Sequence, residues 1–450
     1  MHKQLIGEQL TISKQLLRWT FLVIPVAVTS GCMVALFLSL LGWAIEYRFA
    51  HTWLLYLLPA AGLLIHFIYQ LVGKSSEKGN NLIVEEIHQP ATGVPKLMGP
   101  IILITTVITH LFGGSAGREG TAVQIGGSLA SMFSSWFKLN RLDTQTLLTA
   151  GVAAGFGAVF GTPLTGAIFA MEVLAIGRIQ YSALLPCLMA AIIGDLTVSA
   201  IGVQHAHYHI DVLPNIHHSF SQYFSLDLLL LVKAVIASVA FGLASYLFAE
   251  LTYGIKNMFL ESIKKRWIIP VLGGFIIILL TTVLGRPDYL SLGVQAEYPG
   301  AVTISSAFHE GGADSWSWFW KSIYTAVTLG SGFKGGEVTP LFYIGATLGN
   351  ALSQLLDAPV SLFAALGFIA VFAGATNTPL ACTLMGVELF GGEFALFYAV
   401  ACFTAYYFSG HSGIYTSQKI AVSKTADSST DSLSEIVKQR RNLRKRLFGR

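Results

Sequence analysis

The chain has 450 residues, of which 53% are hydrophobic and only 12% charged, and its formal net charge is +4 at pH 7. Soluble domains carry about 25% charged residues, so this composition excludes an ordinary soluble protein. The small net charge also gives no sign of nucleic-acid binding. We therefore expect a membrane protein made mainly of helices, because a helix satisfies its own backbone in lipid.

Apolar segments long enough to cross, or nearly cross, a bilayer follow a polar start at 1–18. They lie at 20–45, 53–73, 97–113, 145–176, 181–202, 226–254, 267–285 and 359–409. Several are short or interrupted by Gly and Pro, which is typical of tilted and broken helices. The first is too long for a signal peptide, so we expect a retained, cytoplasmic N-terminus. The membrane domain is predicted to span residues 19–420.

Two glycine-flanked polar motifs interrupt the apolar sequence. The first is GREGT at 117–121, and the second is GFKGGEVTP at 332–340. Each is followed by an apolar helix, and a helix start carries unpaired N–H groups and a partial positive charge that attract anions. Two such starts in corresponding parts of a membrane chain predict an anion pathway near the bilayer midplane.

The segments that follow the two motifs are similar to each other. Ile125-Gly126 aligns with Ile344-Gly345, and the segment 151–173 resembles 367–389, with Glu172 opposite Glu388. We therefore predict two related halves, at about 19–205 and 220–420, which meet near 203–225. Because carboxylates are expensive to bury in lipid, we expect the two glutamates to cap neighbouring helices rather than to take part in transport.

The cysteines and the His-rich stretch are not expected to bind metal. Cys32, Cys187, Cys382 and Cys402 lie in apolar segments without metal-like spacing, so we expect small core residues. The His-rich stretch 205–218 resembles a metal-binding cluster, but its place between the halves favours a solvated loop.

The C-terminal tail, 421–450, is basic. Its last part, 438–450, holds seven Lys and Arg residues and no acid, which predicts a cytoplasmic end near anionic lipid. The stretch 423–435 is predicted to be a flexible linker.

The two motifs, together with Tyr415 in HSGIYTSQ, resemble the CLC family of chloride channels and proton-coupled antiporters over residues 60–420. Three departures from the chloride-transporting pattern narrow this resemblance. The chain has GNNLI at 79–83, Thr121 at the end of the first motif, and Val173 in place of an internal proton-relay glutamate. All three resemble the fluoride-exporting branch, the CLC-type fluoride/proton antiporters.

The resemblance implies an all-α polytopic membrane protein of CLC architecture, with two inverted-topology repeats of tilted and broken helices. It also implies a homodimer with one pore per subunit, and the segments 181–202 and 367–389 are rich enough in small and apolar residues to pack in this way. The implied function is export of fluoride in exchange for protons across the bacterial inner membrane, with both termini cytoplasmic. A chloride/proton exchanger or a voltage-gated-type chloride channel stays open as the alternative.

On this resemblance Glu119 is the gating and proton-carrying glutamate. The anion site is then formed by Asn80, Asn81, Gly120, Val338, Thr339 and Tyr415. Fluoride is strongly hydrated, so a site that removes its water must supply dense hydrogen bonding. The asparagine amides and the hydroxyls of Thr339 and Tyr415 offer such donors. The alternative for the two asparagines is a helix N-cap, which these residues favour.

A buried carboxylic acid favours its neutral form, so Glu119 is suited to alternate between a protonated and a charged state. When charged, it would occupy the anion site itself. A salt bridge with Arg118 is not expected, because neighbours i and i+1 do not face one another on a helix. Lys334 and Glu337 offer a pairing near the second helix start and are left out of the site.

No cofactor and no metal are expected, since neither a nucleophile–base pair nor metal-ligand spacing occurs in the apolar segments. The partners expected are fluoride and protons, with chloride as the alternative anion, together with the lipid bilayer and a second copy of the chain. The rival from another class is a membrane sensor that binds a ligand without moving it. A buried acid between two helix starts argues against that rival.

Overall fold

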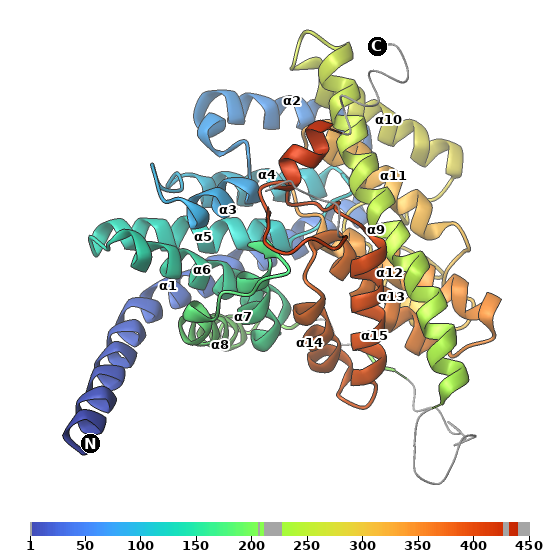
Figure 1. Cartoon of the computed structure of the whole chain (residues 1–450). Coiled ribbons are helices and arrows are strands. Elements are labelled where there is room, and N and C mark those ends of the chain that lie inside the picture. The colour runs from blue at the N-terminus through green and yellow to red at the C-terminus, as the bar shows by residue number, and fades with distance from the viewer. Residues whose placement is uncertain (1, 206–207, 211–226, 426–431, 440–450) are drawn as a thin grey trace.

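The computed structural model describes residues 2–205, 208–210, 227–425 and 432–439. It is almost entirely helical, and the helices from the two halves of the sequence gather on opposite sides of the molecule (Figure 1). The first half contains α1 (His2–Ala50), α2 (Leu58–Ile68), α3 (Asn80–His88), α4 (Met98–Leu111), α5 (Glu119–Trp136), α6 (Arg141–Phe160), α7 (Pro163–Glu172) and α8 (Leu184–Ala200). The second contains α9 (Leu228–Ser262), α10 (Ile268–Leu284), α11 (Ser317–Gly330), α12 (Val338–Leu356), α13 (Val360–Thr376), α14 (Pro379–Phe390) and α15 (Ala395–Phe408).

Short elements join these helices. They are the 3-10 or π turns at Thr52–Leu57, Tyr69–Gly73, Lys74–Ser76, Tyr181–Ala183 and Ser306–Phe308. The strands β1 (Ala175–Ile176) and β2 (Lys419–Ile420) form a small parallel sheet that ties the end of α7 to the segment after α15.

The helices differ widely in length, as expected for a membrane bundle with broken helices. Within the part of the chain that the structure describes, four helical segments are long and apolar enough to cross a membrane: Gln9–Ala50, Thr52–His88, Tyr181–Ala200 and Leu228–Ser262. Shorter apolar helices, such as Met98–Leu111 and Val360–Thr376, lie between them. This mixture confirms the predicted all-α membrane fold.

Corresponding helices make corresponding contacts in the two halves. Helix α5 packs on α6 as α12 packs on α13, α6 packs on α8 as α13 packs on α15, and α1 packs on α8 as α9 packs on α15. The repeated pattern supports the predicted relationship between the halves.

Glycines let the backbones of α5 and α6 meet, and the equivalent glycines do the same for α12 and α13. A Cβ added at Gly126 would lie 2.0 Å from the carbonyl oxygen of Gly151, and one added at Gly345 would lie 2.0 Å from that of Gly367. Side chains therefore cannot enter either contact, and small residues are what allow helices to pack this closely in a membrane.

Glu172 and Glu388 cap one another's helices, as the sequence predicted. The Glu172 carboxylate, at the end of α7, accepts hydrogen bonds from the backbone N–H groups of Leu380 (3.1 Å) and Ala381 (2.8 Å) in the first turn of α14. The Glu388 carboxylate, in α14, accepts from the N–H groups of Leu164 and Thr165, both at 2.8 Å, in the first turn of α7. Each acid thus satisfies orphan N–H groups and faces the positive end of a helix.

The predicted N-terminal segment is helical where the structure describes it, because α1 runs without interruption from His2 to Ala50. Two predictions about surfaces are wrong. The proposed dimer face at 367–389 is excluded for residues 367–376, which are buried within the chain. Cys32 is exposed, whereas the other three cysteines are buried as expected.

The stretch 423–435 also departs from the predicted flexible linker where the structure describes it. The Lys424 ammonium donates to Asn377 Oδ1 (2.6 Å) and to the carbonyls of Tyr406 (2.6 Å) and Gly410 (2.7 Å). Leu433 packs on Tyr406 in a small apolar cluster. The described part of this stretch is therefore fixed to the membrane domain, and the basic residues 440–450 lie outside the described residues.

Candidate anion site

The starts of α5 and α12 are joined by their backbones. Gly117 and Gly336, which occupy equivalent places in the two motifs, form an antiparallel bridge. The Gly117 N–H donates to the Gly336 carbonyl (2.6 Å), and the Gly336 N–H donates to the Gly117 carbonyl (2.8 Å). Because equivalent residues exchange both hydrogen bonds, the two motifs are related here by a local two-fold axis.

Glu119, the first residue of α5, reaches across this joint to the start of α12. Its Oε2 accepts the backbone N–H of Thr339 (3.0 Å), and its Oε1 accepts the Thr339 hydroxyl (2.5 Å). The Arg118 N–H donates to the same Oε2 at 3.1 Å. The side chain is only 1% exposed. A carboxylate thus stands in the place that a helix start offers to a free anion.

Arg118 pairs with Glu119, which corrects the prediction that it does not. Its Nε lies 3.5 Å from Glu119 Oε1. Arg118 is the N-cap of α5, with φ −114° and ψ −23°, and lies outside the regular helix, so the spacing of side chains on a helix does not apply to it. The arginine therefore contributes positive charge beside the carboxylate.

Asn80 and Asn81 begin α3, but neither is its N-cap, so the capping alternative is wrong. The N-cap is Gly79, whose φ of 56° suits a glycine. The Asn80 amide nitrogen lies against Gly120, within 2.8 Å of where a Cβ would stand, and the buried Asn80 Oδ1 has no hydrogen-bond partner among the described residues. Asn81 Oδ1 instead accepts the N–H of Ser417 at 3.0 Å. Of the two, Asn80 faces the joined helix starts.

A cavity of about 150 Å³ brings Asn80, Asn81 and Tyr415 together, and we call it the inner cavity. Val338 and Thr339, the first two residues of α12, are buried and do not line this cavity. Glu119 and Thr339 are in contact, and Asn80 lies beside Gly120. The structure shows no direct bond from Asn81 or Tyr415 to Glu119.

Aromatic rings connect α12 to Tyr415. Phe342 stacks on Phe368 with ring centroids 3.8 Å apart and meets Phe372 edge-on at 5.3 Å. Phe169 stacks on Phe372 at 5.7 Å and presents its ring to Tyr415 at 6.4 Å. This array of rings links the first turns of α12 to Tyr415 through α13 and α7.

Several residues of the inner cavity were missed or left out by the sequence analysis. Tyr253, Lys256, Lys334 and Glu337 line it, and the Lys334 ammonium lies over the Tyr69 ring, 4.1 Å from its centroid. Lys256 can be found from the sequence, since an ionisable residue inside a long membrane helix is a candidate functional residue. The predicted apolar segment ends at residue 254 and so does not include Lys256.

The two remaining predictions concern a proton relay and a metal. Val173 has no carboxylate, and its carbonyl accepts the Gln418 Nε2 donor at 2.8 Å. His205 Nε2 lies 3.5 Å from Asp195 Oδ1, whereas His207, His217 and His218 lie outside the described residues. Within the described ranges, no group of three or more His, Cys, Asp or Glu side chains is placed to hold a metal ion.

Comparison with known proteins agrees with this geometry. A family model described as voltage gated chloride channel matches residues 61–410. The chain is 46% identical over 418 residues to the chloride/fluoride channel protein of Pseudomonas syringae pv. tomato, covering 93% of this chain and 90% of that one. The crystal structure of a CLC-type fluoride/proton antiporter matches with a TM-score of 0.82 and 32% identity, over 90% of this chain and 98% of that one.

A more distant structure shares the fold alone. The slow cyanobacterial Cl⁻/H⁺ antiporter matches with a TM-score of 0.71 and 20% identity, over 87% of this chain and 94% of that one. The family-model match, the 46% identical relative and the paired motifs around Glu119 agree, and the chain belongs to the voltage-gated chloride channel (CLC) family.

Proposed function

We propose that the chain exports fluoride in exchange for protons across the bacterial inner membrane, acting as a transporter and not as an enzyme. The names of two relatives support this substrate: one is a chloride/fluoride channel protein, and another is a CLC-type fluoride/proton antiporter. A further relative, from Vibrio cholerae, is a proton/chloride exchange transporter, so chloride is the anion that must be tested against fluoride.

The observation that carries the proposal is the Glu119 carboxylate on the Thr339 N–H and hydroxyl. In its charged form Glu119 fills the start of α12 and excludes an anion. Protonation removes its charge and weakens its hold on donors that prefer an anion. An anion then takes its place, and return of the charged carboxylate expels that anion. One place that holds either the carboxylate or the anion couples opposite fluxes of anion and proton.

The donors around this place suit fluoride. The Asn80 amide nitrogen lies beside Gly120, Thr339 supplies an N–H and a hydroxyl, and Tyr415 lines the adjoining cavity. Fluoride loses a tightly held water shell on entry, and only dense hydrogen bonding offsets that loss.

Access from two sides is also provided. Arg118, immediately before Glu119, lines a second cavity of about 180 Å³, which we call the outer cavity. Asn80, which touches Gly120, lines the inner cavity. The two residues that flank Glu119 thus each approach a different cavity, Arg118 directly and Gly120 through Asn80, which supports a role for Glu119 in alternating access.

The same proposal includes orientation and assembly. Both termini are cytoplasmic, in keeping with the basic tail. Two copies pair through α8, which exposes Leu184, Leu185, Ile192 and Leu196 and therefore presents apolar side chains that another copy can cover.

The test is efflux from proteoliposomes, read with fluoride and chloride electrodes while internal pH is followed. Fluoride efflux that is coupled to proton influx, without chloride efflux, supports the proposal. Equal chloride flux replaces it with a chloride/proton exchanger, and chloride flux without proton movement replaces it with a channel. Absence of flux for both anions removes transport and favours a sensor.

A further inference from the structure

The outer cavity is separate from the cavity that contains Asn80, Asn81 and Tyr415. It lies between the end of α1 and the segment 287–302, and its charged lining residues are Arg48, Arg118, Asp288 and Glu297. Gln204 and Gln295 add amide donors to its wall. Arg48 is separated from the N-terminus by the length of α1, so it faces the outside when that terminus is cytoplasmic.

Arg48 is buried in this wall and is only partly satisfied. Its side chain is 3% exposed, and its Nη2 lies 2.9 Å from Glu297 Oε2. The guanidinium carbon stands 4.8 Å from the centroid of the Phe49 ring. The buried Nε has no hydrogen-bond partner among the described residues. Buried donors are nearly always paired, and the guanidinium is well suited to an anion, so the free donor points to a ligand.

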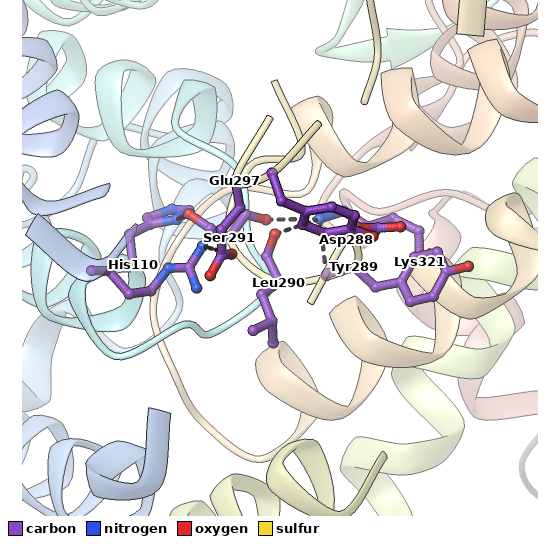
Figure 2. A network of polar contacts seen from close by, with 9 residues as sticks. His110, Asp288, Tyr289, Leu290, Ser291, Glu297 and Lys321 are labelled. Atoms are coloured by element: carbon purple, nitrogen blue, oxygen red, sulfur yellow. Dashed lines mark hydrogen bonds and ion pairs between the residues drawn. The ribbon is translucent and has the colours of Figure 1, made fainter. Parts of the chain in front are cut away.

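The segment 289–291, which precedes Glu297 in the same wall, is anchored by buried side chains. Lys321, fully buried in α11, donates to the carbonyls of Ser291 (2.7 Å) and Tyr289 (3.1 Å). His110 Nδ1 lies 2.9 Å from Ser291 Oγ, and Figure 2 shows these contacts converging on the segment 289–291. Glu297 follows this anchored segment, and its own side chain, 14% exposed, retains access to the cavity.

The outer cavity and the Glu119 site share Arg118 and a similar pairing of a carboxylate with hydrogen-bond donors. Arg118 lines the cavity and stands 3.5 Å from Glu119 through its Nε. In both places a carboxylate of the chain occupies donors that suit an anion. Glu119 occupies the N–H and hydroxyl of Thr339, and Glu297 occupies the guanidinium of Arg48.

We propose that the outer cavity binds a small inorganic anion at Arg48, and that Glu297 competes with this anion for the guanidinium. The identity of the anion as fluoride rests on the proposed function. An anion displaced from Thr339 by Glu119 passes Arg118, is held at Arg48, and leaves when the Glu297 carboxylate returns to the guanidinium. The existence of the site does not rest on transport, so equilibrium binding tests it separately.

The experiment measures fluoride and chloride binding to the purified full chain in detergent by isothermal titration calorimetry. The test variant is Glu297→Gln, which leaves Arg48 charged and without its carboxylate. The matched control is Asp314→Asn, which breaks the exposed Arg286–Asp314 ion pair near the same wall and lines no part of the cavity. Removing a competing carboxylate is expected to tighten anion binding by about tenfold or more.

The expected result is a site with tighter binding in Glu297→Gln than in the wild type and in Asp314→Asn. Adding Arg48→Lys should weaken it again, because the ammonium keeps the charge but not the fork of donors. Binding in Glu297→Gln that matches the control overturns the proposal. If the new site takes chloride and refuses fluoride, the outer site stands and the fluoride assignment under the proposed function falls.

Discussion

The joint between α7 and α14 is symmetric, whereas the joint between α5 and α12 is not. Across the first, Glu172 and Glu388 each cap the other's helix. Across the second, Gly117 and Gly336 exchange backbone bonds, but one carboxylate alone enters, and Val338 stands at the place equivalent to Glu119.

The reciprocal caps at the α7–α14 joint stabilise the fold. At the α5–α12 joint, the Glu119 carboxylate occupies a helix start where a free anion can bind instead. Functional sites are expected where a protein breaks a pattern that it follows elsewhere, as the α5–α12 joint does. The predictions that follow test this difference, first in the packing shared by both joints and then at each carboxylate.

The largest effect is expected from the glycine contacts that set both halves. Gly345→Ala places a Cβ 2.0 Å from the Gly367 carbonyl oxygen, and Gly126→Ala does the same at Gly151. The helices must separate, at a cost of about 3 kcal/mol or more. Size-exclusion chromatography with a thermal ramp should show little monodisperse protein for either variant. Gly254→Ala in α9, where nothing lies within 4 Å, is the control and should keep the wild-type melting temperature.

The next effect separates coupling from folding at the asymmetric joint. Glu119→Gln cannot alternate between a charged and a neutral carboxyl group, so proton flux in proteoliposomes should fall by about a hundredfold or more. The variant should still fold, because the amide oxygen accepts from Thr339, and its loss of stability should not exceed the value of about 1–2 kcal/mol expected at the other joint. Proton flux retained in this variant would move the proton-carrying role to another residue.

The symmetric joint should show the opposite behaviour. Glu388→Gln and Glu172→Gln each lose a charged acceptor at a helix start, and each should lower the free energy of unfolding by about 1–2 kcal/mol. The Glu388 change should be the larger, since that carboxylate also accepts the Thr165 hydroxyl at 2.6 Å. The ratio of proton to fluoride flux should be unchanged in both. A changed ratio would mean that these glutamates carry protons as well.

The sequence was sufficient for the fold class, the paired motifs and the capping role of Glu172 and Glu388, because each rests on local pattern. The capping alternative for the two asparagines and the expectation of no Arg118–Glu119 contact are wrong, since both depend on which residue starts the helix. Gly79 and Arg118 turned out to be the N-caps. Arg48 and Glu297 come from distant segments, and single-sequence patterning gives no means of pairing them.

The smallest effect distinguishes two neighbouring asparagines. Asn80 presents its amide nitrogen to Gly120, whereas Asn81 holds the Ser417 N–H at 3.0 Å. Asn80→Ala removes a donor from the anion, and fluoride affinity measured by calorimetry should fall by about tenfold. Asn81→Ala should change that affinity much less and lower thermal stability instead, because it frees α3 from the segment after Tyr415. Equal losses of affinity in the two variants would show that the GNNLI segment acts as one donor unit. Both asparagines would then belong to the anion site at the α5–α12 joint.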